Sequence, residues 1–169
     1  MPKNSIEQLI RKLDLQPHPE GGYFKETYRS NGQIHEDSLG SGYKGSRHYS
    51  TCIYFLLTSE SFSALHRIKQ DEIWHFYDGS PIRLHVISPA GQYAEHLVGR
   101  DLSKGEVPQF VVPGGSWFAA EVKEADEFSL AGCTVSPGFD FRDFEMASGP
   151  ELTSKFPELE KIIARLVRG

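Results

Sequence analysis

The sequence has few cysteines, no long apolar runs and no excess of positive charge, and each shortage excludes a class of protein. Cys52 and Cys133 are the two cysteines among 169 residues, too few for the disulfide framework of a small secreted domain. No apolar run approaches the roughly 20 residues of a membrane span, and the N-terminus lacks the apolar core of a signal peptide. The formal net charge of -5 argues against a basic, nucleic-acid-binding surface. We therefore expect a cytoplasmic protein that binds neither membranes nor nucleic acid.

Glycine and proline, in contrast, are frequent and are spread along the chain. The 16 glycines and 10 prolines favour many short elements joined by turns. The length is that of one ordinary domain, and 38% hydrophobic residues are enough to build a core. We expect a single domain over residues 1–169.

Strand-like patterns dominate residues 47–145. In one of them Ile82, Leu84 and Val86 alternate with Arg83 and His85, as in a strand with one buried face. Frequent turn signals separate such runs, which predicts an all-β sandwich or barrel. The predicted strands are residues 23–28, 51–57, 62–68, 73–77, 82–87, 93–98, 107–112, 117–122, 128–135 and 139–144.

Helical patterns occur only near the two ends of the chain. Apolar residues recur at helical spacing in residues 5–13, and one apolar stripe extends from residue 151 to residue 167. Residues 31–46 are rich in Gly, Ser and Asn, which indicates a long exposed loop that could act as a lid or be disordered.

The segment from Ser63 to Gly79 is the most informative for function. His66 ends one apolar run and Glu72 begins the next, with a turn between them. If two adjacent strands joined by this turn carry them, both side chains lie close together on one face. A buried carboxylate needs a partner, because burying it unpaired costs several kcal/mol. His66 is therefore the expected partner of Glu72.

This segment resembles the first motif of the cupin superfamily. His66, Glu72 and Gly79 have the spacing of that motif, and Ile68 stands where a second histidine is usual. The second motif is matched by Pro113 and Gly115, with Phe118 where its histidine is usual. Two of the four usual metal ligands thus remain and two are apolar.

Further segments resemble one branch, the fifth cupin family, a single-domain family without an assigned function. The resemblance implies a double-stranded β-helix (jelly roll) with short N- and C-terminal helices, and a homodimer formed through sheet edges. Its implied neighbours include nucleotide-sugar 3,5-epimerases, which work without a metal. The segments that carry it are residues 17–23, 66–67, 71–77, 112–117 and 132–139.

The pair His66 and Glu72 has three interpretations. It could be a structural hydrogen bond, a divalent metal site with ligands missing, or a metal-free acid–base or ligand-binding pair. Four ligands, one of them often water, are typical of a zinc site, and Ile68 and Phe118 supply none. The third interpretation is favoured, and no cofactor is predicted. If a metal is bound, His66 and Glu72 are its expected ligands.

Several other residues are candidates for binding a ligand. Trp74, Trp117 and Phe118 could form an aromatic wall, although such residues are more often ordinary core. Asp140 could orient a catalytic histidine, as an Asp does in the metal-free epimerases. Strand alternation places Trp74 inward with Glu72, and His75 and Tyr77 on the other face. The predicted ligand-binding residues are Trp74, His75, Tyr77, Trp117, Phe118, Cys133 and Asp140.

The segment from His18 to Gly22 contains two glycines that suggest close backbone approach. Its residues His18 and Glu20, with Tyr23 after them, could line the mouth of the pocket or be exchanged between subunits.

Three functions remain open at this point, the least specific of them a structural or storage-like role that needs no pocket chemistry. The first is an acid–base isomerase, epimerase or lyase acting on a sugar-like or small polar molecule, with His66 as the acid or base and Glu72 beside it. The second is a cupin that binds a metabolite without turnover.

Overall fold

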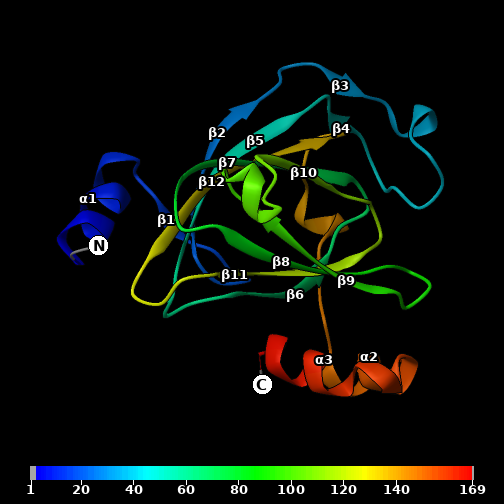
Figure 1. Cartoon of the computed structure of the whole chain (residues 1–169). Coiled ribbons are helices and arrows are strands. Elements are labelled where there is room, and N and C mark those ends of the chain that lie inside the picture. The colour runs from blue at the N-terminus through cyan, green and yellow to red at the C-terminus, as the bar shows by residue number, and fades with distance from the viewer. Residues whose placement is uncertain (1–2, 169) are drawn as a thin grey trace.

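Two antiparallel sheets packed face to face form the body of the molecule, a jelly roll with helices near both chain ends (Figure 1). The computed structural model describes residues 3–168. The six-stranded sheet has the order β1 (Gln16–Pro17), β2 (Tyr23–Arg29), β5 (Thr51–Thr58), β12 (Phe128–Ser136), β7 (Asp71–Gly79) and β10 (Gln109–Val112). The five-stranded sheet has the order β13 (Glu145–Met146), β6 (Ser63–Arg67), β11 (Trp117–Val122), β8 (Ile82–Ile87) and β9 (Tyr93–Val98). The prediction of an all-β jelly roll is confirmed.

The interior between the sheets is apolar along most of its length. Strand alternation turns Phe55, Trp74, Leu84 and Phe118 inward, and all four are almost completely buried. Trp74 packs edge-on against Phe55, with ring centroids 5.6 Å apart. This dense packing fills part of the barrel, so a cavity has room only toward one end.

The helices cover outer faces of the sheets. α1 (Lys3–Lys12) packs through Ile6, Leu9 and Ile10 onto a cluster that includes Leu56 and Phe128. α2 (Gly149–Lys155) and α3 (Glu160–Leu166) lie under the five-stranded sheet (Figure 1) and bury Leu65, Ile87 and Trp117 against it.

Residues 151–167 do not form the one continuous helix that was predicted. Pro157 has no N–H to donate, and the residue before it is disfavoured in the helical region. Phe156 accordingly has φ -132° and ψ 70°, and a 3-10 turn, η4 (Pro157–Leu159), separates α2 from α3.

The predicted strand at residues 139–144 is also absent. Asp140 caps a 3-10 turn, η3 (Phe141–Asp143), by accepting a hydrogen bond from the Arg142 N–H. This local side-chain bond competes with a strand ladder. β13 begins only at Glu145.

His66 and Glu72 do not lie on adjacent strands of one sheet, as was predicted. β6 and β7 are not paired neighbours: β6 pairs with β11 and β13, and β7 pairs with β12 and β10. The chain crosses from one sheet to the other between Arg67 and Asp71. The two side chains therefore approach across the barrel interior, not along one sheet face.

The segment that follows β2 extends away from the barrel and is tied back to it. It contains β3 (Gln33–Ile34), η1 (Glu36–Ser38) and β4 (Arg47–His48), which lie beyond the end of the sheets in Figure 1. A further 3-10 turn, η2 (Leu102–Lys104), follows β9. None of the helices within residues 3–168 is both long enough and apolar enough to pass through a bilayer.

Candidate functional site

A cavity of about 330 Å³ lies between the sheets, at the end where β5 and β7 begin and β12 finishes. The volume is at the lower end of the range for small-molecule pockets. Its walls combine apolar and aromatic side chains with several polar ones. The polar lining residues are His18, Glu20, Glu26, Arg29, Thr51, His66, Glu72, Cys133 and Asp140.

His66 is paired with Glu20. The His66 Nε2 lies 2.7 Å from Glu20 Oε2, and both side chains are almost completely buried. At 2.7 Å, the His66 Nδ1–H donates to the Ala64 carbonyl oxygen. Burial alone would lower the pKa of His66, but Glu20 and the more distant Glu72 raise it above its ordinary value. His66 is therefore an imidazolium whose two N–H groups are both engaged by the protein.

Glu20 carries the matching negative charge. Burial disfavours the charged form, yet the contact with His66 lowers the pKa of Glu20 below its ordinary value. The carboxylate and the imidazolium form a fixed buried ion pair. Such pairs are retained only when geometry and hydrogen bonds compensate for lost hydration, and both are present here.

Glu72 titrates differently from Glu20. It lies on β7 facing the cavity, and burial together with the negative charge of Glu20 raises its pKa to about 7. His66 opposes this shift, as does a hydrogen bond with the Cys133 thiol. A carboxyl with this pKa exchanges a proton readily near neutral pH, which is the property required of a general acid or base.

Cys133 lines the cavity beside Glu72. Burial and the neighbouring Glu72 raise the pKa of this thiol well above its ordinary value. The thiol therefore stays protonated and is not activated as a nucleophile. It acts as a small wall residue that also hydrogen-bonds Glu72.

The segment from Gly138 to Phe144 forms one wall of the cavity. It contributes Phe139, Phe141 and Phe144, whose rings contact one another edge-on with centroids 5.0–6.3 Å apart. Asp140 also lines the cavity, but Arg142 binds its carboxylate at 2.8 and 2.9 Å and holds its pKa far below the usual range. Asp140 is thus a fixed negative charge in this wall.

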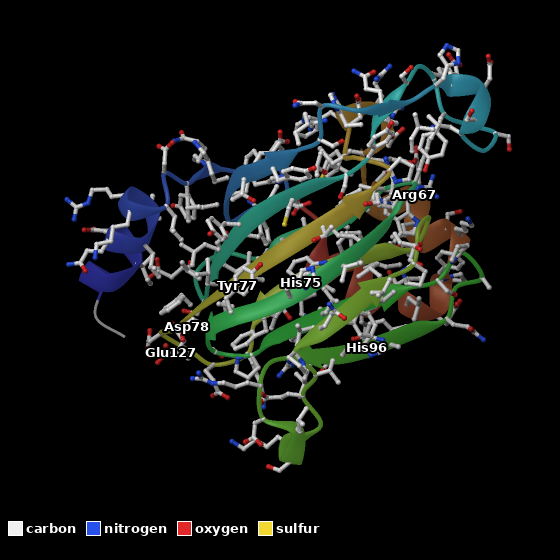
Figure 2. All side chains as sticks on the ribbon, turned by 90° about the horizontal axis from the view of Figure 1, so that it is seen from above. Arg67, His75, Tyr77, Asp78, His96 and Glu127 are labelled. Atoms are coloured by element: carbon white, nitrogen blue, oxygen red, sulfur yellow. The ribbon has the colours of Figure 1, made fainter. Side chains whose placement is uncertain are left out.

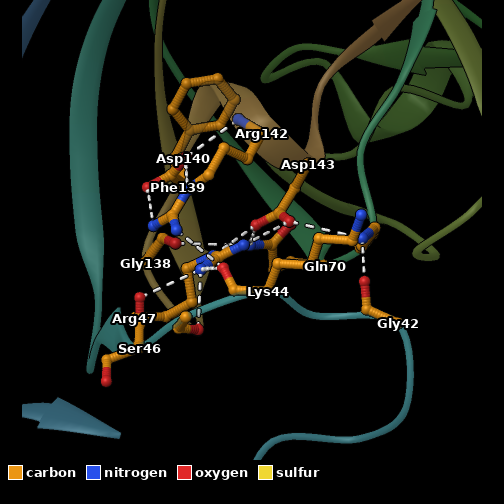
Figure 3. A network of polar contacts seen from close by, with 12 residues as sticks. Gly42, Lys44, Ser46, Arg47, Gln70, Gly138, Phe139, Asp140, Arg142 and Asp143 are labelled. Carbon is orange, nitrogen blue, oxygen red and sulfur yellow. Dashed lines mark hydrogen bonds and ion pairs between the residues drawn. The ribbon is translucent and has the colours of Figure 1, made fainter. Parts of the chain in front are cut away.

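A buried ion pair anchors this wall (Figure 3). Arg47 Nε and Nη2 donate to the two Asp143 oxygens at 2.7 and 2.8 Å, and Gln70 adds a third hydrogen bond at 2.8 Å. The remaining Arg47 nitrogen, Nη1, donates to the carbonyl oxygens of Lys44, Gly45 and Ser46. The long loop after β2 and the aromatic wall are therefore joined by one network of buried hydrogen bonds. Asp143 belongs to this network and does not face the cavity.

The two predicted catalytic residues, His66 and Glu72, both line the cavity, but only two of the predicted ligand-binding residues do. Cys133 and Asp140 are those two. Trp74 is inward, as alternation predicted, but packs in the apolar core. Phe118 lies against the His66 ring, with centroids 4.1 Å apart, and is not part of the cavity lining.

Trp117, His75 and Tyr77 point away from the interior and are not part of the cavity lining, as alternation predicted for His75 and Tyr77; the role of all three in binding a ligand stays a prediction. Trp117 packs against the C-terminal helices, and the Arg67 guanidinium lies 4.4 Å from its ring centroid. His75 Nε2 lies 3.0 Å from the Thr134 hydroxyl. Figure 2 shows His75 and Tyr77 together on the outer side of the six-stranded sheet, where Tyr77 is 47% exposed. Alternation along β7 separates both from Glu72.

The donor set does not fit a resident divalent metal. Ile68 and Phe118 occupy two of the usual ligand positions, and His66 Nε2 is already bound to Glu20. Across residues 3–168, no three His, Cys, Asp or Glu side chains are grouped so that they could hold a metal ion. Of the two motif ligands only Glu72 is then free to bind a metal, and one ligand is too few.

Comparison with known proteins agrees with the sequence motifs and the fold. Residues 7–147 match the family model described as "Cupin superfamily (DUF985)". The chain belongs to this cupin family. An uncharacterised protein of Saccharomyces cerevisiae is 36% identical over 158 residues, which cover 89% of this chain and 79% of the yeast protein.

Solved structures are similar over nearly the whole chain. A hypothetical protein from Leishmania major has a TM-score of 0.86 and 39% identity, covering 96% of this chain and 98% of that one. Protein SO0799 from Shewanella oneidensis has a TM-score of 0.84 and 37% identity, covering 96% of each chain. The oxalate decarboxylase of Bacillus subtilis shares only the fold, at a TM-score of 0.55 and 15% identity over 90% of this chain and 37% of that chain. This cupin is thus similar to proteins without an assigned activity.

The partner of His66 had only a weak signal in the sequence. The two glycines after Glu20 predicted that its segment lines the mouth of the pocket or is exchanged between subunits, but nothing linked Glu20 to His66, 46 positions away. Gly21 and Gly22 have φ of 111° and 75°, which glycine adopts readily. These glycines form the turn that brings Glu20 into the cavity.

Proposed function

We propose that this cupin is a metal-free acid–base enzyme that acts on a small, uncharged polar or sugar-like molecule. The reaction is an isomerisation, epimerisation or lyase-type step in which Glu72 carries the proton. The observation that supports this most strongly is a cavity-lining carboxyl whose pKa is raised to about 7. Enzymes tune glutamate pKa values to this range for general acid–base catalysis.

The ion pair of His66 and Glu20 has a supporting role in this proposal. Both nitrogens of His66 are occupied, at 2.7 Å each, so His66 is not the proton-transferring group that the sequence predicted. Its partner Glu20 keeps a negative charge near Glu72 and so helps to raise the pKa of Glu72. Burial is the larger cause of the raised pKa of Glu72, and the pair contributes through Glu20 without touching the transferred proton.

The charges around the cavity favour an uncharged substrate. Glu20, Glu26 and Asp140 are carboxylates, and Arg29 is bound by Glu26 through two hydrogen bonds of 2.8 Å. The imidazolium of His66 is neutralised by Glu20. Each cation among the described lining residues is already paired with a carboxylate, so a phosphate or carboxylate would find no unpaired positive charge there, and ionised Glu72 would repel it.

Exchange of carbon-bound hydrogen with solvent tests the proposal without knowledge of the product. The protein is incubated in D₂O with a panel of neutral sugars and small hydroxycarbonyl compounds, and loss of C–H signals is followed by NMR. We expect at least one compound to exchange, and Glu72→Gln to slow this exchange by about 10²–10⁴-fold, the usual contribution of a general acid or base.

Glu121→Gln is the control, because Glu121 is likewise a strand glutamate near a buried histidine but lies outside the cavity. This variant should catalyse the exchange of the added compound's C–H hydrogen at the wild-type rate. If compounds raise the melting temperature but none exchanges, the protein is a metabolite-binding cupin without turnover. Unchanged exchange in Glu72→Gln would rule out Glu72 as the proton carrier.

A further inference from the structure

His18 lines the cavity through a side chain that is only 7% exposed, and the acid–base chemistry described above does not use it. The turn after β1 fixes its position: the His18 N–H donates to the Gly22 carbonyl at 2.9 Å, and its own carbonyl accepts from Gly21 at 3.0 Å. The ring packs edge-on against Phe24, with centroids 4.6 Å apart. His18 is therefore held rigidly at the cavity wall.

One nitrogen of the His18 ring is assigned by its contact. The Glu20 backbone N–H donates to His18 Nδ1 at 3.2 Å, so Nδ1 is an acceptor and carries no proton. The proton of the neutral ring is therefore on Nε2. Burial lowers the pKa of His18, which keeps the ring neutral near pH 7 despite the Glu20 carboxylate 3.7 Å from Nδ1.

The Nε2–H group of His18 has no acceptor within residues 3–168. The two nitrogens of an imidazole point in widely different directions, so Nε2 is turned away from the backbone that holds Nδ1. Among the described residues, the side-chain atoms that are both sealed from solvent and without a partner are Ser63 Oγ, Gln70 Oε1 and Trp74 Nε1, so His18 Nε2 is open to the cavity that His18 lines. A donor that the protein leaves unpaired at a cavity wall is available to a ligand that accepts the hydrogen bond.

We propose that His18 Nε2–H donates to the carbonyl oxygen of the substrate, so that the pocket takes small, uncharged carbonyl compounds with a C–H bond beside the carbonyl. This inference rests on the proposed function and names its substrate class. A neutral imidazole suits this task, because it polarises a carbonyl without adding a positive charge to the site.

The resulting step balances with the residues present. Ionised Glu72 takes the proton from the carbon beside the carbonyl, the C–H electron pair forms a C=C bond, and the carbonyl π pair moves to oxygen. His18 hydrogen-bonds that developing oxyanion. For a 2-hydroxycarbonyl compound, Glu72 returns the proton to the former carbonyl carbon. The proton of the 2-hydroxyl group passes to the oxyanion, and the carbon that carried that hydroxyl becomes the new carbonyl carbon. This completes an isomerisation without any other reactant.

Three probes of one carbon skeleton separate the elements of this proposal. Dihydroxyacetone carries the carbonyl, glycerol has a hydroxyl in its place, and dihydroxyacetone phosphate adds negative charge. We expect dihydroxyacetone to raise the melting temperature more than glycerol or the phosphate ester does. Its infrared carbonyl stretch should fall to lower frequency on binding, because a hydrogen bond weakens the C=O bond.

Two substitutions of His18 isolate the donor. His18→Phe keeps an aromatic ring but removes the donor, and it should abolish the infrared shift and slow deuterium exchange by about 10²–10³-fold, the effect of losing one oxyanion donor. His18→Gln places an amide N–H near the position of Nε2 and should restore part of both. Melting temperatures of the free variants establish that each remains folded.

The outcomes distinguish this inference from the proposed function. A His18-dependent infrared shift without exchange in the wild type supports carbonyl recognition and contradicts catalysis. Exchange that depends on Glu72 but is unchanged in His18→Phe contradicts the role of His18 and leaves catalysis intact. Equal stabilisation by glycerol, or the absence of any His18-dependent shift, overturns the inference.

Discussion

Two buried histidines in this molecule each contact a glutamate with similar geometry, but their pKa values shift in opposite directions. In the cavity, His66 Nε2 lies 2.7 Å from Glu20, and on the outer side of the five-stranded sheet His85 Nε2 lies 2.8 Å from Glu121. The pKa of His66 is raised, whereas burial lowers the pKa of His85.

The difference comes from the third charged group beside each pair. Glu72 adds a second carboxyl near His66, which favours the imidazolium. Near His85 the third group is Arg165, which binds Glu121 at 3.0 and 3.1 Å and opposes a positive charge on the ring. The Tyr93 hydroxyl lies 2.8 Å from His85 Nδ1, which suits a neutral ring that accepts there. A contact distance alone therefore does not reveal whether a histidine is charged.

Removing each histidine tests this comparison with the largest expected effect on stability. His66→Leu leaves the Glu20 carboxylate buried without a partner and should cost about 3–5 kcal/mol of unfolding free energy. In His85→Leu, Arg165 still holds Glu121, so the cost should be smaller, about 1–2 kcal/mol. Urea denaturation of both variants at pH 7 measures the difference. Equal losses would contradict the assignment of one charged and one neutral pair.

The pH dependence of stability sharpens the comparison at Glu72. The pKa of Glu72 in the folded protein, about 7, lies above the ordinary value of 4.5 that applies to the unfolded chain. Between these two pH values the folded state therefore binds more protons than the unfolded state. The stabilisation that protonated Glu72 contributes to the folded state is therefore fully present below pH 4.5 and is lost as the pH rises through 7. The Glu72→Gln variant lacks this pH dependence. Its free energy of unfolding, relative to that of the wild type, should therefore rise by on the order of 3 kcal/mol between pH 4.5 and pH 8. A pH-independent difference in denaturation midpoints would show that Glu72 ionises normally.

Arg165→Met tests the other pair with the smallest expected effect. Burial lowers the pKa of His85 most, and repulsion by Arg165 lowers it further, so removal of Arg165 should raise that pKa. NMR titration of the His85 ring measures the change, and the His66 ring serves as the internal control. A pKa of His85 that stays constant or falls would mean that Arg165 has no such role.

The sequence predicted the jelly roll and most of its strands because alternation and turn residues are local signals. It also placed Glu72 inward, with His75 and Tyr77 on the opposite face. The aromatic wall at residues 139–144 was misassigned, since the hydrogen bond from Arg142 to Asp140 competes with the strand. The helix break was missed although Pro157 is visible in the sequence.

The site was only partly predictable, because its decisive contact joins residues far apart in the chain. His66 and Glu72 were identified from motif spacing, but the pairing of His66 with Glu20 depends on how the segment after β1 crosses the barrel end. Trp117 could not be assigned to a face from composition, since tryptophan packs equally well under a helix. The homodimer, the single domain over residues 1–169 and the cytoplasmic location stay predictions.

The measurement that tests the central claim most directly is the pKa of Glu72 in the folded protein. Carbon-13 NMR of labelled glutamate side chains, assigned with Glu72→Gln, follows its carboxyl as pH changes. We predict a midpoint near pH 7, well separated from the ordinary glutamates on the surface. A midpoint near 4.5 would mean that Glu72 is ionised throughout the neutral range and would contradict the proposed proton transfer.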